Sequence, residues 1–224
     1  SSLILRAQQL FITYSEQKIY WGNNPMNSLV YLYLDRIQRY DIETFQHSCR
    51  VSNLSYLIGQ FLSLSINDLE LLKNAAYLHD LGKTKIPKNI LSKKETLLPD
   101  EWNQIQNHPD MGSQLLKRTR KPVKQISNII LAHHEKWDGS GYPYGLQGEE
   151  IPYPARIIAL ADALDAMITT RPYRIPILIT EAYSEVDRCK GRHFDPYVAK
   201  GLLKIDANKL NRVVYDVRGL GTNF

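Results

Sequence analysis

The stretch His133-His134-Glu135-Lys136-Trp137-Asp138-Gly139-Ser140-Gly141-Tyr142-Pro143 joins two adjacent histidines to a turn that is rich in glycine and closed by proline. Neutral imidazoles are good metal ligands, and glycine permits backbone conformations and close approaches that a Cβ resists. We therefore expect a helix to end at the histidines and a functional loop to begin there. A His-His pair alone also fits the polar end of an ordinary helix, so its meaning depends on the other histidines.

The bulk composition is that of an ordinary globular protein. Of 224 residues, 43% are apolar and 23% are charged, and the formal net charge is +5. No apolar run approaches the ~20 residues of a membrane span, and no signal-peptide pattern opens the chain. Cys49 and Cys189 form no CxxC motif, which argues against a thiolate zinc site and favours a reducing cytoplasm. The basic residues are mostly scattered, so we expect no nucleic-acid polymer as partner.

Apolar residues recur every three or four positions along most of the chain, which is typical of amphipathic helices. The expected helices cover residues 28–40, 43–63, 67–81, a segment starting at Pro99, 110–118, 122–134, 154–170, 177–190 and 196–204. Asp41 and Asn67 are the expected starts of the second and third helices, and Gly82 is the expected end of the third. The only candidate strand is Arg212 to Val217. This pattern predicts an all-α bundle.

Histidines and carboxylates gather at the ends or on the faces of these expected helices. Glu43 and His47 are four residues apart and so share a helix face. Further imidazole and carboxylate groups come from His79, Asp80, His108, His133, His134 and Asp162. A mixed set of this kind suits iron, manganese or zinc. Because the set is too large for one ion, we expect two metals, the usual device for phosphoryl hydrolysis, with Asp80 as the candidate bridge between them.

Several motifs together resemble a known family. The sequence His79-Asp80-Leu81-Gly82-Lys83, followed by the His133–Pro143 stretch, is similar to the HD-GYP subgroup of HD-superfamily phosphohydrolases. The similarity continues through Ile151-Pro152, Ala155-Arg156-Ile157, Ala161-Asp162, Asp165-Ala166, Arg171-Pro172-Tyr173-Arg174 and Phe194-Asp195-Pro196. The resemblance implies an HD-superfamily helical bundle over residues 41–204, preceded by a helical or linker segment (1–40) and followed by a C-terminal tail (205–224).

The same resemblance implies an activity and a ligand set. It implies that cyclic di-GMP is hydrolysed to linear pGpG, GMP or both by a hydroxide held between metal ions. The positions that match the family's metal ligands are His47, His79, Asp80, His108, His133, His134 and Asp162. Glu43 matches the extra carboxylate of members with a third metal, so we expect two or three divalent ions, iron or manganese. Glu43 could instead cap its helix, where an acidic side chain interacts favourably with the helix dipole.

Cationic residues near these ligands are candidates for substrate binding. Lys83, three residues after Asp80, is placed to stabilise the charge that develops on a phosphate, so we count Asp80 and Lys83 as the catalytic pair. Arg171 and Arg174 follow the helix of Asp162 and can fork onto a second phosphate or a guanine edge.

Two further residues have supporting roles in this prediction. Tyr142 is expected either to stack on a base of the substrate or to fill the turn in which it lies. Asp165, one turn after Asp162, is expected to orient a histidine or a metal-bound water rather than to bind a metal itself.

Two other functions stay open from the sequence. The Gly-Tyr-Pro loop could recruit a GGDEF-domain diguanylate cyclase, with catalysis secondary. The site could also act on another cyclic dinucleotide, because base identity depends on a few contacts only. The complete ligand set favours hydrolysis of cyclic di-GMP. A homodimer and a sensor domain ahead of residue 1 also stay open.

Overall fold

The computed structural model describes residues 25–117, 119, 121–170 and 175–215. Apart from two isolated β-bridges, its regular elements in this part of the chain are all helical, which confirms the predicted all-α class. The helices are α2 (Pro25–Tyr40), α3 (Ile42–Phe61), α4 (Ile66–Leu78), η1 (Leu81–Lys85), α5 (Lys88–Leu91), α6 (Pro99–Gln106), α7 (His108–Lys117), α8 (Lys121–Leu131), η2 (Gly148–Glu150), α9 (Tyr153–Ile168), α10 (Ile179–Cys189), α11 (Pro196–Leu202) and α12 (Ala207–Tyr215). None of them is both long enough and apolar enough to cross a bilayer.

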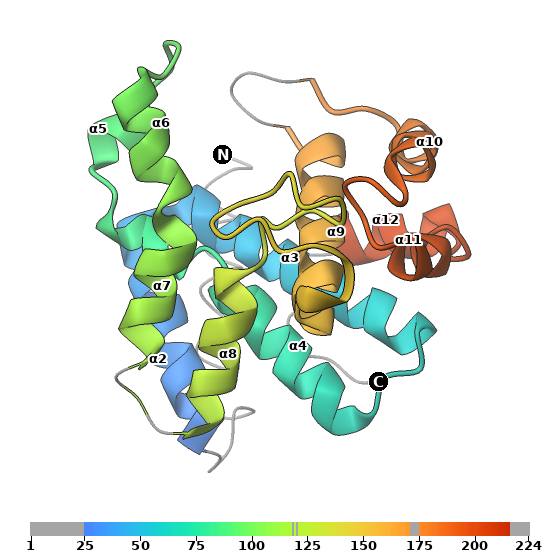
Figure 1. Cartoon of the computed structure of the whole chain (residues 1–224), viewed down its shortest axis with the longest axis horizontal. Coiled ribbons are helices and arrows are strands. Elements are labelled where there is room, and N and C mark those ends of the chain that lie inside the picture. The colour runs from blue at the N-terminus through green and yellow to red at the C-terminus, as the bar shows by residue number, and fades with distance from the viewer. Residues whose placement is uncertain (1–24, 118, 120, 171–174, 216–224) are drawn as a thin grey trace, which may run out of the picture.

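Helix α3 is the centre of the bundle (Figure 1). It packs against α2, α4, α9, α11 and α12, and its side chains Val51, Leu54 and Ile58 are fully buried. The helix starts where predicted, because the Asp41 carboxylate accepts a hydrogen bond from the backbone N–H of Thr44 at 2.9 Å. Helix α3 therefore contributes residues both to the apolar core and to the polar centre described below.

Helices α2 and α12, near the two ends of the described chain, belong to the same core. Leu34 and Ile37 from α2 and Leu210 and Val214 from α12 are buried in it. The predicted strand is therefore wrong over residues 212–215, which are helical, while residues 216 and 217 lie outside the described part. Packing of the apolar face of α12 outweighs the strand preference of its adjacent valines, since β-propensity depends strongly on context.

The boundaries of α4 differ from the prediction in two places. Ser65, and not Asn67, caps the helix, because the Ser65 hydroxyl accepts from the N–H of Asp68 at 3.2 Å. The helix ends at Leu78, so His79 is its C-cap and Asp80 lies at the start of η1.

Gly82 has a different role from the predicted helix stop. It lies within η1, and a Cβ at this position would come within 1.9 Å of the backbone oxygen of His108 and 2.7 Å of the backbone nitrogen of Gly112. Only glycine allows two backbones to approach this closely. This contact seats η1 on the start of α7 and brings Asp80 beside His108.

Candidate metal centre

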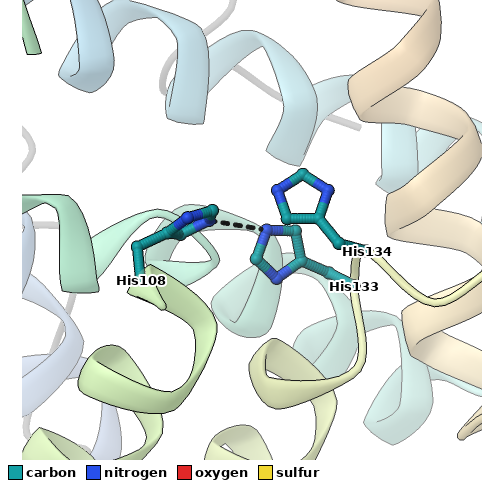
Figure 2. Close-up of side chains that lie close together, drawn as sticks. All are labelled: His108, His133 and His134. Atoms are coloured by element: carbon teal, nitrogen blue, oxygen red, sulfur yellow. Dashed lines mark hydrogen bonds between the residues drawn. The ribbon is translucent and has the colours of Figure 1, made fainter. Parts of the chain in front are cut away.

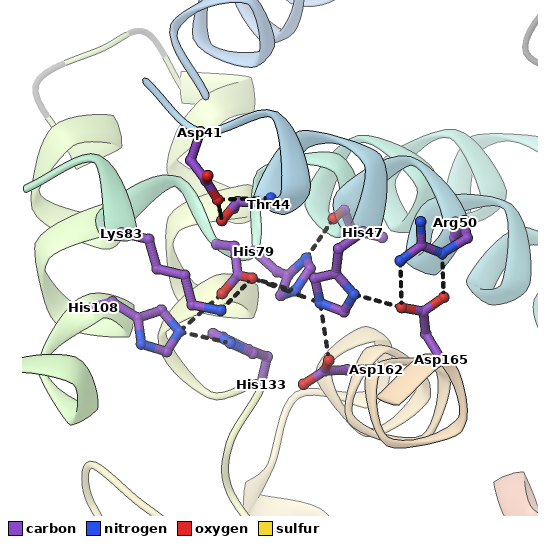
Figure 3. A network of polar contacts seen from close by, with 12 residues as sticks. Asp41, Thr44, His47, Arg50, His79, Lys83, His108, His133, Asp162 and Asp165 are labelled. Carbon is purple, nitrogen blue, oxygen red and sulfur yellow. Dashed lines mark hydrogen bonds and ion pairs between the residues drawn. The ribbon is translucent and has the colours of Figure 1, made fainter. Parts of the chain in front are cut away.

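The ends and faces of α3, α4, α7, α8 and α9 meet around a group of histidines and aspartates (Figure 3). The seven residues implied as ligands by the resemblance all lie here. Their positions are His47 in α3, His79 and Asp80 just after α4, His108 at the start of α7, His133 and His134 just after α8, and Asp162 in α9. Helix α8 ends at Leu131, two residues before His133, so both of these histidines lie in a turn and not in the predicted helix.

Three of these histidines share one hydrogen-bond pattern. The Nδ1 atoms of His79, His108 and His133 lie 2.7, 2.7 and 2.5 Å from the carbonyl oxygens of the residues three positions earlier. A carbonyl oxygen only accepts, so each Nδ1 carries the hydrogen and donates it. In the neutral imidazole this leaves the lone pair on Nε2, which is the form that binds a metal.

These Nε2 atoms face other acceptor atoms and not hydrogen-bond donors. The buried Nε2 of His79 has no hydrogen-bond partner among the described residues, and the Nε2 atoms of His108 and His133 face each other at 3.2 Å (Figure 2). Two lone pairs at this distance repel each other, and a buried polar atom without a partner is costly. A bound cation would remove both penalties, so this donor set fits a metal ion.

The donors form two neighbouring groups, and Asp80 faces both. Among the described residues, one group consists of His108, His133 and His134 and the other of His47, His79 and Asp80, with the donor atoms of each group within 4.8 Å of one another. Asp80 Oδ1 lies 3.2 Å from Nε2 of His108, whereas Oδ2 lies 3.4 Å from Nε2 of His79 and 3.6 Å from Nε2 of His47. A carboxylate that bridges two ions needs this arrangement.

The electrostatics of the centre keep Asp80, His133 and His134 in the forms that bind a metal. Burial would raise the pKa of Asp80, but Lys83 and the surrounding histidines hold this pKa well below its usual value. Burial lowers the pKa of His133 well below the usual range and that of His134 to about 3. Asp80 is therefore an anion, and the two histidines are neutral near pH 7.

His47 lies between two carboxylates from α9. Its Nε2 is 3.1 Å from Asp162 Oδ1, and its Nδ1 is 2.7 Å from Asp165 Oδ2. Burial disfavours a charged imidazole, yet Asp162 and Asp165 raise the pKa of His47 to about 9. These carboxylates thus favour positive charge on the ring, which a metal ion at Nε2 would supply in place of the proton, and Asp165 contacts the histidine through Nδ1, on the side away from Asp80.

The sequence prediction missed Arg50, which pairs with Asp165. Arg50 Nε and Nη2 donate to the two Asp165 oxygens at 2.6 and 3.0 Å. The available signal was the spacing of Arg50 three residues after His47, which puts both on one side of α3.

The other predicted site residues surround this centre. Lys83 Nζ lies 2.7 Å from Asp80 Oδ2, and Tyr142 packs on the His134 ring with their centroids 4.8 Å apart. Glu43 is exposed and belongs to neither donor group, but it lines a cavity of ≈ 330 Å³ together with His47, Arg50 and Lys83. Arg171 and Arg174 lie outside the described residues.

A second residue that the sequence prediction missed, Glu135, holds the loop that carries Tyr142. The buried Glu135 carboxylate accepts from the backbone N–H groups of Tyr144 at 2.7 Å and Leu146 at 3.1 Å. Gly141 lies so close to this residue that a Cβ would be 2.5 Å from Glu135 Cα. The loop therefore folds back against the segment that follows the histidine pair, and Gly141 allows the two backbones to lie this close.

A family model and similar proteins both identify the family that the sequence motifs predict. Residues 34–198 match the model of the HD domain family. The chain is 40% identical over 167 residues to a cyclic di-GMP phosphodiesterase of Thermotoga maritima, covering 74% of this chain and 45% of that protein. It is 38% identical over 177 residues to the 3'3'-cGAMP-specific phosphodiesterase 2 of Vibrio cholerae, covering 79% of this chain and 34% of that protein.

Among solved structures, the HDG"Y"P protein Bd1817 from Bdellovibrio bacteriovorus is similar to this chain. The TM-score is 0.56 at 26% sequence identity, covering 70% of this chain and 50% of the other. The chain spans less than half the length of the two curated relatives described above.

Proposed function

The chain belongs to the HD-domain family, as its sequence motifs predict, and we propose on this basis that it is a metal-dependent phosphodiesterase that hydrolyses cyclic di-GMP. One observation carries the proposal: Asp80 directs its two oxygens toward two groups of histidines, and in both groups histidines bonded through Nδ1 to a backbone carbonyl turn Nε2 toward the centre. The similarity to the cyclic di-GMP phosphodiesterase of Thermotoga maritima supports the choice of substrate.

The proposed ligands divide between two ions. His47, His79 and Asp162 would hold one, His108, His133 and His134 the other, and Asp80 would contact both. When bound, two divalent ions lower the pKa of a water so that hydroxide is available as a nucleophile, and they supply positive charge opposite the phosphate. The imidazole and carboxylate donors suit iron or manganese, and we propose one of these as the native metal.

The chain's own residues would bind and orient the substrate. Lys83, with its ammonium group beside Asp80, would neutralise charge on the scissile phosphate. Tyr142, which packs on His134, would either stack on a base of the substrate or fill the turn in which it lies. Arg171 and Arg174 are proposed for the second phosphate or a guanine edge, and Asp165 for orienting His47.

The decisive test is hydrolysis of cyclic di-GMP by protein reconstituted anaerobically with Fe²⁺ or Mn²⁺. Chromatography would follow the loss of substrate and the appearance of pGpG and GMP. We expect turnover with the reconstituted protein and none after chelation. Protein that binds metal but leaves cyclic di-GMP intact would contradict the proposal.

A second candidate substrate is 3'3'-cGAMP. The similarity to a phosphodiesterase specific for that dinucleotide favours it. Parallel assays with both substrates would separate the candidates through the ratio of their kcat/KM values. If neither is hydrolysed and a GGDEF-domain protein binds through the loop 138–143, recruitment of that partner becomes the better function.

We also propose the limits of the unit that carries this function. Residues 41–204 are proposed as the HD-GYP domain, close to the 34–198 that match the family model. A cytoplasmic location is proposed from the cysteines, since Cys49 and Cys189 are both buried and free.

A further inference from the structure

We infer that Arg50 is a positioning residue of the metal centre. The structure assigns it to hold Asp165 in place and, through Asp165, to direct Nε2 of His47 toward the ion that His47 and Asp162 would share. The inference rests on the proposed metal centre and adds to it a residue that touches no ligand atom of the ions. It concerns one of the two metal positions and leaves the other unaffected.

Four side chains from two facing helices carry the inference (Figure 3). His47 and Arg50 are three residues apart on α3, and Asp162 and Asp165 are three residues apart on α9. Residues at this spacing lie on the same side of a helix. Nε2 of His47 therefore lies beside Asp162, and Nδ1 of His47 lies beside Asp165. Arg50 donates hydrogen bonds to the same Asp165 carboxylate.

The Asp165 carboxylate depends on Arg50 for most of its hydrogen bonds. Its side chain has no exposed surface, and Arg50 donates two hydrogen bonds at 2.6 and 3.0 Å. The His47 Nδ1–H donates a third at 2.7 Å, and the Thr169 hydroxyl is at the limit of contact at 3.5 Å. A buried carboxylate needs compensating charge as well as donors. Arg50 supplies both, and its planar fork fixes the rotation of the carboxylate.

The direction of the carboxylate decides the direction of the imidazole. With Asp165 fixed, the His47 ring has Nδ1 held on one side, so Nε2 must point toward Asp162 and Asp80. Removing Arg50 would free Asp165 to turn, and His47 with it. The second donor group, His108, His133 and His134, comes from α7 and the turn after α8 and forms no hydrogen bond or ion pair with Arg50 in the described structure.

The test is a Mn²⁺ binding isotherm measured by calorimetry on purified, folded protein, with no substrate present. In Arg50→Ala we expect one site to weaken by about 10- to 100-fold, as is usual when a group behind a ligand is removed, and the other site to keep its Kd. Arg50→Lys should lie between wild type and Arg50→Ala, because an ammonium keeps the charge but cannot form the bidentate contact.

Arg156→Ala is the matched control. Arg156 also forms a largely buried ion pair with an aspartate, Asp195, at 3.1 Å, but its hydrogen-bond partners include none of the proposed metal ligands. We expect this variant to lose thermal stability and to keep both Mn²⁺ sites. The comparison separates a general loss of stability from a specific effect on His47.

A double-mutant cycle tests whether Arg50 acts through Asp165. If it does, Asp165→Asn combined with Arg50→Ala weakens the site little more than either change alone, since the effects of coupled residues do not add. An Arg50→Ala isotherm equal to that of wild type, equal weakening of both sites, or additive effects in the cycle would each overturn the inference. If Arg50→Ala does not fold, Arg50→Lys and Asp165→Asn decide in the same way. A wild-type protein that binds no Mn²⁺, Fe²⁺ or Zn²⁺ would overturn the proposed function instead.

Discussion

Asp80 joins the two donor groups through the two oxygens of one side chain. Oδ1 faces His108, and Oδ2 faces His79 and His47. This position follows from local structure, since α4 ends at Leu78 and η1 begins at Leu81, which leaves Asp80 in the short turn between two helices. A residue in such a turn can point its carboxylate across the ends of both elements, whereas a residue within a helix points to one side only.

Replacing Asp80 with Ala should remove both metal binding and turnover. Among the described residues, Asp80 is the carboxylate whose two oxygens face one donor group each. Elemental analysis and the cyclic di-GMP assay would check this result. Asp187→Ala is the control, because Asp187 forms a similar pair with the lysine three residues later, at 2.6 Å, on the surface. Wild-type metal content and rate in Asp80→Ala would contradict the bridging role.

Replacing Lys83 with Ala should preserve the metals and slow the reaction. Lys83 contacts Asp80 at 2.7 Å, and an ammonium group is not a metal ligand, so its proposed contribution is charge at the phosphate. Loss of one such donor typically lowers kcat by about 10²- to 10³-fold. Metal content and kcat should be measured on the same sample, with Lys190→Ala as control. Loss of metal together with rate would make Lys83 a structural residue of the centre.

The predicted role of Glu43 as a third-metal ligand can be tested by counting metals. Glu43 lies in the first turn of α3, is exposed, and lines the cavity beside His47. If Glu43 binds an ion, wild type holds up to three metals per chain and Glu43→Gln holds one fewer, because a neutral amide binds a cation more weakly than a carboxylate does. Two metals in both proteins would leave Glu43 as an acidic residue that stabilises the start of its helix.

Helix positions could be predicted from the sequence, but several element boundaries and supporting contacts could not. The buried face of α3 repeats every three or four residues, and this pattern is visible in the sequence alone. The end of α4 and the place of Gly82 depend on a contact with His108, which no local pattern shows. The same applies to Arg50, whose partner Asp165 is 115 residues away.

The loop after α8 shows how one buried residue can fix a whole segment. Glu135 holds two loop N–H groups with one carboxylate, so we expect Glu135→Gln to loosen the segment around Tyr144 and Leu146. A hydrogen bond to a charged group is worth about 1.5–3 kcal/mol, so the loss of one should speed local amide exchange by roughly 10- to 100-fold. Hydrogen exchange with mass spectrometry would measure it, with Glu149→Gln in the same loop as control. Unchanged exchange at Tyr144 and Leu146 would show that the loop is held by other contacts.

Across the whole molecule, the proposed ligands come from segments that are far apart in the chain. They lie in α3 and α9, at the start of α7, and just after α4 and α8, so bound ions would tie five helices together at one point. The apolar core lies mainly around α3, α4, α8 and α9, whereas α7 contributes Leu116 to it and meets η1 through the close glycine contact. Metal binding is thus expected to stabilise the packing of α7 and α8 on the rest of the bundle.

Removal of the metals should therefore lower the melting temperature. A ligand present at 100 times its Kd stabilises the folded state by about 2.7 kcal/mol, and each kcal/mol shifts Tm by roughly 2–4 °C in a chain of this size. We expect the metal-free protein to melt about 5–10 °C below the Mn²⁺-loaded protein in differential scanning calorimetry. In Asp80→Ala the addition of Mn²⁺ should change Tm little, because the residue that faces both donor groups is missing. Equal melting temperatures for loaded and metal-free wild type would mean that the five helices hold their arrangement without the ions.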